Sequence, residues 1–231
     1  MNILAIEHST ATGSIALLNG EEIVEEATWQ QAPREPSSLI EKISTILTQQ
    51  KLNASEIDVF VVGQGPGIYS SLRISLSTAN GLALPGKKPV YGISSAIAIA
   101  QKHAATNHPD KITVIGDARR NRVWYAPFKV TNEEIKDSQP YQLIAIDELS
   151  GYLQKDDTII SPDWSRLAEP LANIETNNAN IIQCDKIADA ATIGLLAYSR
   201  VKQNIDPQFP LAPIYIHPPV FIKPKFPQYI S

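Results

Sequence analysis

Apolar and polar residues alternate at the start of this chain with the period of two that is typical of β-strands. The alternation covers residues 2–7, 12–18 and 21–29, and Asn19-Gly20 between the last two favours a hairpin turn. Further on, a 3.6-residue apolar period predicts helices, which alternate with short apolar strands. The helices are expected near residues 37–50, 70–84 and 94–104, and the strands at 58–62 and 88–92. The first half therefore has the order βββαβαβα.

The same order of elements begins again after a polar loop at residues 106–110. Strands are expected at residues 112–117, 121–130, within 135–146, 158–161 and 180–184, and helices after Asp147, at 163–173 and from Asp185 to 201. A repeated βββαβαβα order is typical of two tandem ribonuclease-H-like subdomains, the α/β fold of actin-like ATPases and sugar kinases. The predicted subdomains are residues 1–105 and 106–206. Residues 207–231 form a Pro-rich arm that packs back over the body or is partly disordered.

The stretch from Gly63 to Leu84 is unusually rich in small residues. Gly65 and Gly67 flank Pro66, and the three residues predict a tight turn with close backbone approach. The helix that follows carries an apolar stripe expected to face the core, formed by Leu72, Leu76, Ala79 and Ala83. Beside this stripe lies a set of small residues: Ser71, Ser75, Ser77, Thr78 and Gly81. Such a helix is either a docking surface for another chain, an anion site at its first turn, or an ordinary helix buried on both faces.

Composition narrows the class of protein. The chain has 231 residues, 43% of them hydrophobic, and a net charge of −4, which argues against tight nucleic-acid binding by the chain alone. Cys184 is the single cysteine, so internal disulfides are excluded. No apolar run is long enough to span a bilayer, and the first residues lack a basic leader. We expect a globular cytoplasmic protein that does not bind membranes.

A nucleotide site is the first function to test on such a fold. The turn after the first strand, Glu7-His8-Ser9-Thr10, has hydroxyls and a nearby Gly13, but it has Glu where Mg²⁺ sites of this kind use the shorter Asp. The corresponding turn at 116–122 is rich in arginine rather than glycine, and no Gly-Gly pair for adenine follows it. The four histidines lack metal-ligand spacing, so no metal site is expected. A divergent actin-fold ATPase or small-molecule kinase using Glu7, Ser9 and Thr10 nevertheless stays open as the alternative.

Several segments resemble the TsaB (YeaZ) family. They are the start Ile3-Leu4-Ala5-Ile6-Glu7-His8-Ser9-Thr10, the segment Gly63-Gln64-Gly65-Pro66-Gly67 with Leu72-Arg73-Ile74, and Asp117-Ala118-Arg119-Arg120. The resemblance is dense over residues 2–126. It implies a non-catalytic scaffold subunit that pairs with a TsaD-type transferase, is joined by a TsaE-type ATPase, and supports threonylcarbamoyl transfer to adenosine 37 of tRNA. It also implies self-association as a homodimer when the chain is alone, and contact with tRNA only through the complex.

The resemblance further implies which residues contact partners. Docking would use the helices at 37–50 and 70–84, where a charge at Ser75 or Ala79 would block it. The candidate partner-binding residues are Leu39, Ile43, Ile46, Ser71, Ile74, Ser75, Thr78 and Ala79. The candidate phosphate-contacting residues in the complex are Ser9, Thr10, Arg119 and Arg120. No cofactor is expected in the isolated chain, while Mg-ATP or ADP is expected at the complex interface.

The chain departs from the family pattern at three places, one of which is the C-terminal Tyr215-Ile216-His217 with the Pro-rich tail, so the resemblance implies no function for the tail. The family usually begins its first turn with D-T-S-T, where this chain has Glu7-His8-Ser9-Thr10, and Ser71 replaces a glycine of the family's G-L-R-I segment.

Overall fold

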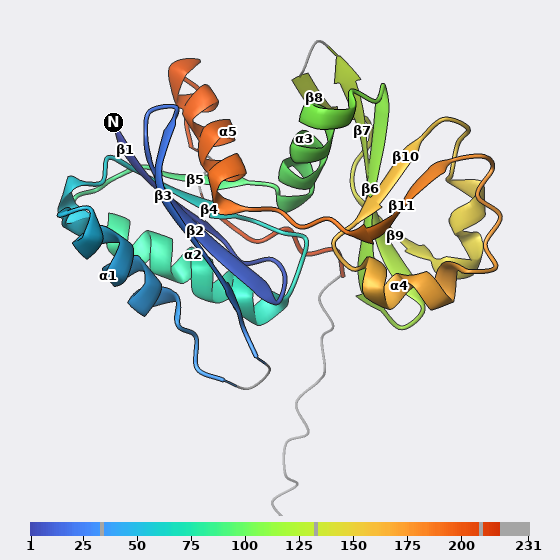
Figure 1. Ribbon diagram of the computed structural model, residues 1–231, viewed down its shortest axis with the longest axis horizontal. Coiled ribbons are helices and arrows are strands. Elements are labelled where there is room, and N and C mark those ends of the chain that lie inside the picture. Colours follow the sequence, from blue (N-terminus) through green and yellow to red (C-terminus); the bar gives the residue numbers. More distant parts are fainter. Residues whose placement is uncertain (33–34, 132–133, 208–209, 218–231) are drawn as a thin grey trace, which may run out of the picture.

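The computed structural model describes residues 1–32, 35–131, 134–207 and 210–217, and it has two lobes, each built on one β-sheet (Figure 1). The first sheet has the strand order β3-β2-β1-β4-β5. Its strands are β1 (Asn2–Glu7), β2 (Thr12–Asn19), β3 (Glu22–Gln30), β4 (Val59–Gly63) and β5 (Val90–Ile93). β1 pairs antiparallel with β2 and parallel with β4. Apolar runs such as Ile3–Ile6 are buried because helices cover both faces of the sheet.

The second sheet repeats this arrangement. Its order is β11-β10-β6-β7-β8, with β9 also paired to β7. The strands are β6 (Lys111–Arg119), β7 (Arg122–Thr131), β8 (Glu134–Asp137), β9 (Gln142–Ala145), β10 (Thr158–Ser161) and β11 (Asn180–Asp185). β6 pairs antiparallel with β7 and parallel with β10, as β1 does with β2 and β4. The predicted duplicated ribonuclease-H-like fold is therefore confirmed.

Two local predictions for the second half differ from the structure. The single third strand expected within residues 135–146 is two strands, β8 and β9, which pair with opposite ends of β7. Pro140 lies between them and has no N–H for a ladder bond. The helix expected after Asp147 is a 3₁₀-helix, Ile146–Gly151.

Two of the helices pack on the sheet formed by the other half of the chain, and they join the two lobes. α1 (Leu39–Gln49) and α2 (Tyr69–Ala83) cover one face of the first sheet, and α4 (Trp164–Leu171) packs on the second (Figure 1). α3 (Ser95–Asn107) belongs to the first half of the chain but packs on the second sheet, whereas α5 (Ala190–Lys202) returns to the first. One hydrophobic core therefore contains residues of both sheets together with α3 and α5.

Polar side chains cap the first turns of α3 and α5. Ser94 caps α3, and its side chain accepts a hydrogen bond from the Ile97 N–H at 3.3 Å. Asp185 does not cap α5, because its carboxylate accepts from the Ser165 N–H instead, and Asp189 is the cap. Within the described residues, no helix combines the length and the apolar character needed to cross a membrane.

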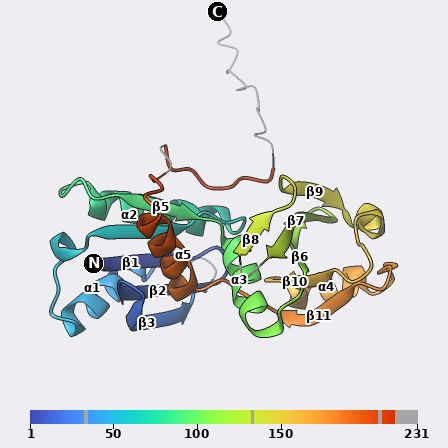
Figure 2. The same cartoon turned by 90° about the horizontal axis from the view of Figure 1, so that it is seen from above.

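The described part of the C-terminal arm packs back on the body. Figure 2 shows it running along the side of the first lobe, beside β5 and α2, toward the second lobe. Leu211 and Ile216 pack against the hydrophobic clusters of the body. The remainder of the predicted arm, residues 218–231, lies outside the described residues.

Candidate partner-docking surface and interlobe cleft

The turn between β4 and α2 is fixed tightly to the end of β1. Gly65 has a φ of +87°, which favours glycine, and a Cβ on Gly67 would lie 2.1 Å from the Ser9 carbonyl oxygen. The Ile68 N–H donates a hydrogen bond to that same oxygen at 2.8 Å. The predicted tight turn is confirmed, and it fixes where α2 starts relative to the first sheet.

Glu7 is a structural group rather than a ligand of the cleft. Its carboxylate is buried and accepts hydrogen bonds from the Ser9 N–H at 2.7 Å and from the Ser95 hydroxyl at 2.8 Å. It lies directly against Gly63, where any Cβ would collide with it. Burial raises the pKa of Glu7. A carboxylate enclosed in this way is not available to a metal-bound nucleotide, so the residues do not fit the Mg²⁺ site that the alternative function needs.

The glycine expected to face a phosphate is also covered. Gly13 on β2 pairs with Trp29 on β3, and a Cβ on Gly13 would lie 2.2 Å from the indole ring. The second lobe repeats this arrangement, because Gly116 on β6 lies under the indole of Trp124 on β7. Both glycines make room for a tryptophan of the chain itself, and not for a phosphate.

His8, which departs from the family pattern, is buried without hydrogen-bond partners. Its ring meets Trp29 edge to face, with ring centroids 5.3 Å apart. Among the described residues, neither ring nitrogen of His8 nor the indole nitrogen of Trp29 has a hydrogen-bond partner. Burial lowers the pKa of His8, so the ring is held neutral.

Six of the eight predicted partner-binding residues lie inside the protein. The six are Leu39, Ile43, Ile46, Ser71, Ser75 and Ala79. Because Ser71, Ser75 and Ala79 follow one another at four-residue spacing next to the Leu72–Leu76 stripe, they face the first sheet and let α2 approach it closely. Only Ile74, which is 40% exposed, and the partly exposed Thr78 reach the surface. These six side chains are buried in the isolated chain, and their contact with a partner stays a prediction.

A different set of residues forms the exposed side of α2. We call it the α2 outer face: Ser70, Ile74, Ser77, Thr78 and Gly81. A Cβ on Gly81 would meet no atom within 4 Å, so this face is open. Ile40 on α1, which covers the same face of the first sheet, is 59% exposed. None of the five side chains of the α2 outer face is charged, and the exposed Arg73 borders them, with its guanidinium on the Tyr69 hydroxyl.

A cleft of about 910 Å³ lies between the lobes and the arm. Of the predicted phosphate-contacting residues, Ser9, Thr10 and Arg119 line it and Arg120 does not. The Thr10 hydroxyl is engaged within its own loop, where it donates to the Thr12 carbonyl at 3.0 Å. The other lining residues include Pro66–Tyr69 of the first lobe, Asp117 and Trp124 of the second, and Ile214–His217 of the arm.

Four charged side chains in the second-lobe wall of the cleft pair with one another, and Asp185 adds a further carboxylate to that wall. The Asp117 carboxylate pairs with Arg119 at 3.0 Å and with Arg166 at 3.3 Å. Asp163 accepts a hydrogen bond from the Asp117 N–H at 2.9 Å and also pairs with Arg166. Burial raises the pKa of Asp163, and Arg166 opposes that shift. Arg119 is therefore committed to Asp117, and within the described ranges no three acidic, histidine or cysteine residues are grouped to hold a metal ion.

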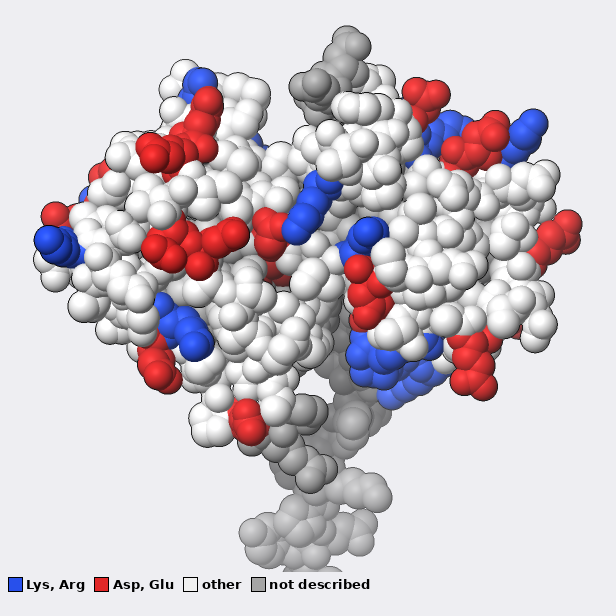
Figure 3. Space-filling model, viewed as in Figure 1, with Lys and Arg blue, Asp and Glu red and all other residues white. Residues whose placement is uncertain are grey.

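The surface carries no broad positive region on the face seen in Figure 3. Acidic and basic side chains are mixed there, with one compact basic group at the lower edge of the second lobe.

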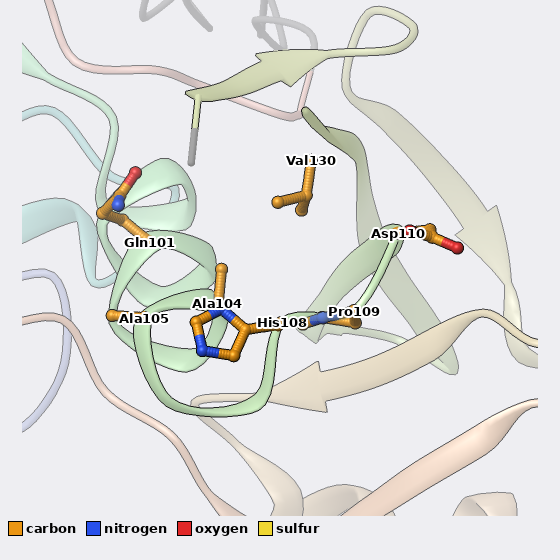
Figure 4. Close-up of a pocket in the computed structure, with 7 residues that line it drawn as sticks. All are labelled: Gln101, Ala104, Ala105, His108, Pro109, Asp110 and Val130. Carbon is orange, nitrogen blue, oxygen red and sulfur yellow. The ribbon is translucent and has the colours of Figure 1, made fainter. Parts of the chain in front are cut away.

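A second pocket, of about 390 Å³, lies between the end of α3 and β7 (Figure 4). Its lining includes Ala104, His108 and Val130 but no lysine or arginine, and Figure 4 shows the Asp110 carboxylate pointing away from His108. This pocket does not have the chemistry of a phosphate site.

Two ribonuclease-H-like sheets with exchanged helices and a cleft between the lobes define a protein of the two-subdomain, actin-like class. The family model described as "TsaD: tRNA N6-adenosine threonylcarbamoyltransferase" matches residues 32–202, and the chain belongs to this family, within its TsaB (YeaZ) branch. The resemblance found in the sequence is thereby confirmed.

Individual relatives agree with this placement. The chain is 31% identical over 130 residues to the Escherichia coli tRNA threonylcarbamoyladenosine biosynthesis protein TsaB, and 30% identical over 139 residues to its Haemophilus influenzae counterpart. These matches cover 56% and 59% of this chain and only 55% and 56% of the two relatives. The structure of YeaZ from Pseudomonas aeruginosa superposes with a TM-score of 0.76 at 18% identity, covering 93% of this chain and 100% of that one, and thus supports the fold.

Proposed function

We propose that this chain is a non-catalytic subunit in the synthesis of threonylcarbamoyladenosine in tRNA, and that it docks on a TsaD-type transferase through the α2 outer face. The relatives named TsaB support the pathway, and the transferase family model supports the kind of partner. In the absence of that partner, the same face would pair two copies of this chain. Contact with a TsaE-type ATPase and with tRNA would then arise in the assembled complex.

The observation that carries this proposal is the composition of the α2 outer face. Ile74, Ser77 and Gly81 are exposed, short or apolar, and uncharged. Interface cores are depleted of charge, and helix axes, which pack about 8–10 Å apart, come closest where the side chains between them are small. The turn at Gly65–Gly67 holds this helix in place against β1, so the surface is preformed.

The carboxylates of Glu7, Asp117 and Asp163 are already engaged within the protein, which supports a scaffold rather than an enzyme. Glu7 is enclosed, and Asp117 and Asp163 are paired with arginines. In this proposal Mg-ATP or ADP is held by the complex and not by the chain alone, because Glu7 cannot reach a metal ion.

The test is co-purification with the transferase after Ser77→Arg or Gly81→Arg. We expect neither variant to lower the melting temperature and both to lose the partner. Ser199→Arg, on the exposed side of α5 across the sheet, is the matched control and should still bind. Retention of the transferase by both α2 variants would show that docking uses another surface. A charge at Ser75 or Ala79 is not a suitable test, because both residues are fully buried and the change would disturb folding.

A further inference from the structure

The C-terminal arm is anchored first on the first lobe. After α5, the Tyr91 hydroxyl donates a hydrogen bond to the Ile205 carbonyl at 2.9 Å. Leu211 then packs against the hydrophobic cluster under α1 and α2. Gly92 leaves room for this contact, since a Cβ there would lie 2.4 Å from a methyl carbon of Leu211.

Gln64 holds the middle of the arm with both its main chain and its side chain. The Ile214 N–H donates to the Gln64 carbonyl at 2.8 Å. The Gln64 side-chain amide donates to the Ala212 carbonyl, also at 2.8 Å. Gln64 itself is buried, and its two hydrogen bonds join two segments of the chain that are distant in sequence.

The far end of the arm is anchored on the second lobe. His217 Nε2 donates a hydrogen bond to the Ala118 carbonyl, at the end of β6, at 2.7 Å. Ile216 packs against the core that both lobes share. Between the two anchors, the Tyr215 ring lies 5.3 Å from the ring of Tyr69 at the start of α2.

The path of the arm follows the place where this class of fold binds ligands. Gln64 follows β4, Gly92 lies in β5 and Ala118 lies near the end of β6, so the arm crosses the carboxyl ends of parallel strands in both sheets. Ligands of open α/β sheets bind in the crevice outside those ends. Here Ile214–His217 form part of the wall of that crevice.

We propose that residues 211–217 form an intramolecular strap, which takes up part of the interlobe cleft and holds the two lobes in one relative position. Lobes of one chain are expected to move relative to each other unless a large hydrophobic interface holds them, and the core shared through α3 and α5 already joins these two on one side of the cleft. The strap has anchors on both lobes and would oppose that movement, and this inference stands whether or not the chain docks on a transferase.

Pulsed electron spin resonance on the full chain tests the strap. One spin label goes on Cys184 in the second lobe, which is exposed and is the single cysteine, and the other on a cysteine introduced at Thr48 on α1. The unmodified strap should give one narrow distance distribution. Leu211→Ala with His217→Ala should broaden or shift it, while Gln203→Ala, outside the strap, should not.

Hydrogen exchange of the same proteins provides the second measurement. The Ile214 amide should be protected in the starting protein and should exchange at least about tenfold faster in the double variant. Gln64→Ala and His217→Ala alone should each accelerate exchange of the Ile214 amide. These single variants keep the test valid if the double variant does not fold. Rapid exchange of Ile214 in the starting protein, or an unchanged interlobe distance after Ile214 is released, would overturn the proposal.

Discussion

The Glu7 carboxylate accepts a hydrogen bond from the Ser95 hydroxyl at 2.8 Å, and this bond ties the first strand of the first lobe to the first residue of α3. Because α3 packs on the second sheet, one buried acid lies at the joint between the lobes. It occupies the position where an actin-like enzyme would present a metal ligand to the cleft.

Replacing Glu7 separates its structural contribution from its charge. Glu7→Ala leaves the buried Ser9 N–H and Ser95 hydroxyl without their acceptor and should lower the free energy of unfolding by about 1–3 kcal/mol. Glu7→Gln keeps the shape and should cost less. Urea denaturation of the three proteins measures both effects, and equal losses in the two variants would contradict this account.

The difference in folding stability between the starting protein and Glu7→Gln should change with pH in one direction. Burial raises the pKa of Glu7 above its usual 4.5, so between that pH and the folded pKa the folded state binds more protons than the unfolded state. The stability of the starting protein should therefore fall, relative to Glu7→Gln, as pH rises above 4.5 through the folded pKa. A stability difference that does not change between pH 4.5 and 7.5 would show that Glu7 titrates normally.

His8 should make the protein sensitive to mild acid. Burial lowers the folded pKa of His8 below the usual 6.5, so the unfolded state takes up protons first and the stability of the fold falls as pH drops below 6.5. His8→Thr, which restores the usual family residue, should remove up to about 1.4 kcal/mol per pH unit of this slope. Urea denaturation from pH 5 to 7.5 checks it. His103 also has a lowered pKa and is retained in both proteins, so the difference between them reports His8.

Two glycines near α2 should respond to alanine in opposite directions. A Cβ on Gly67 would collide with the Ser9 backbone, so Gly67→Ala should destabilise the protein by about 1–3 kcal/mol. Gly81 lies in the helix with open space around it, so Gly81→Ala should stabilise the protein by about 0.5–1 kcal/mol. Thermal denaturation of the two variants gives the comparison, and the same sign for both would contradict the described turn.

The periodicity of the sequence predicted most elements of the fold but not the partners of the helices. The period of two in β1 and β2 and the 3.6-residue stripe of Leu72 and Leu76 indicate a buried face. They carry no information on which sheet covers that face. The packing of α3 on the second sheet and of α5 on the first was therefore found only in the structure.

For a related reason, the sequence did not show which of the predicted partner-binding residues are exposed. Ser71 and Ser75 are small, and a small residue suits close approach to a sheet as well as to a partner chain. The sequence could not tell the two surfaces of α2 apart, because Ser71, Ser75 and Ser77 are chemically alike. The arm was recognised by its prolines, but its contacts with Gln64 and Ala118 have no periodic signal.

Because α5 packs on the first sheet, the first lobe can be completed only after most of the second half of the chain has been synthesised. α5 ends at Lys202, and it covers the face of the first sheet opposite α1 and α2. While the ribosome is still making the second half, that sheet has one apolar face bare, with Leu18 and Ala5 open where Gly194 will later pack. The first lobe is thus finished almost last, and a nascent chain stopped before residue 190 would present this surface to chaperones.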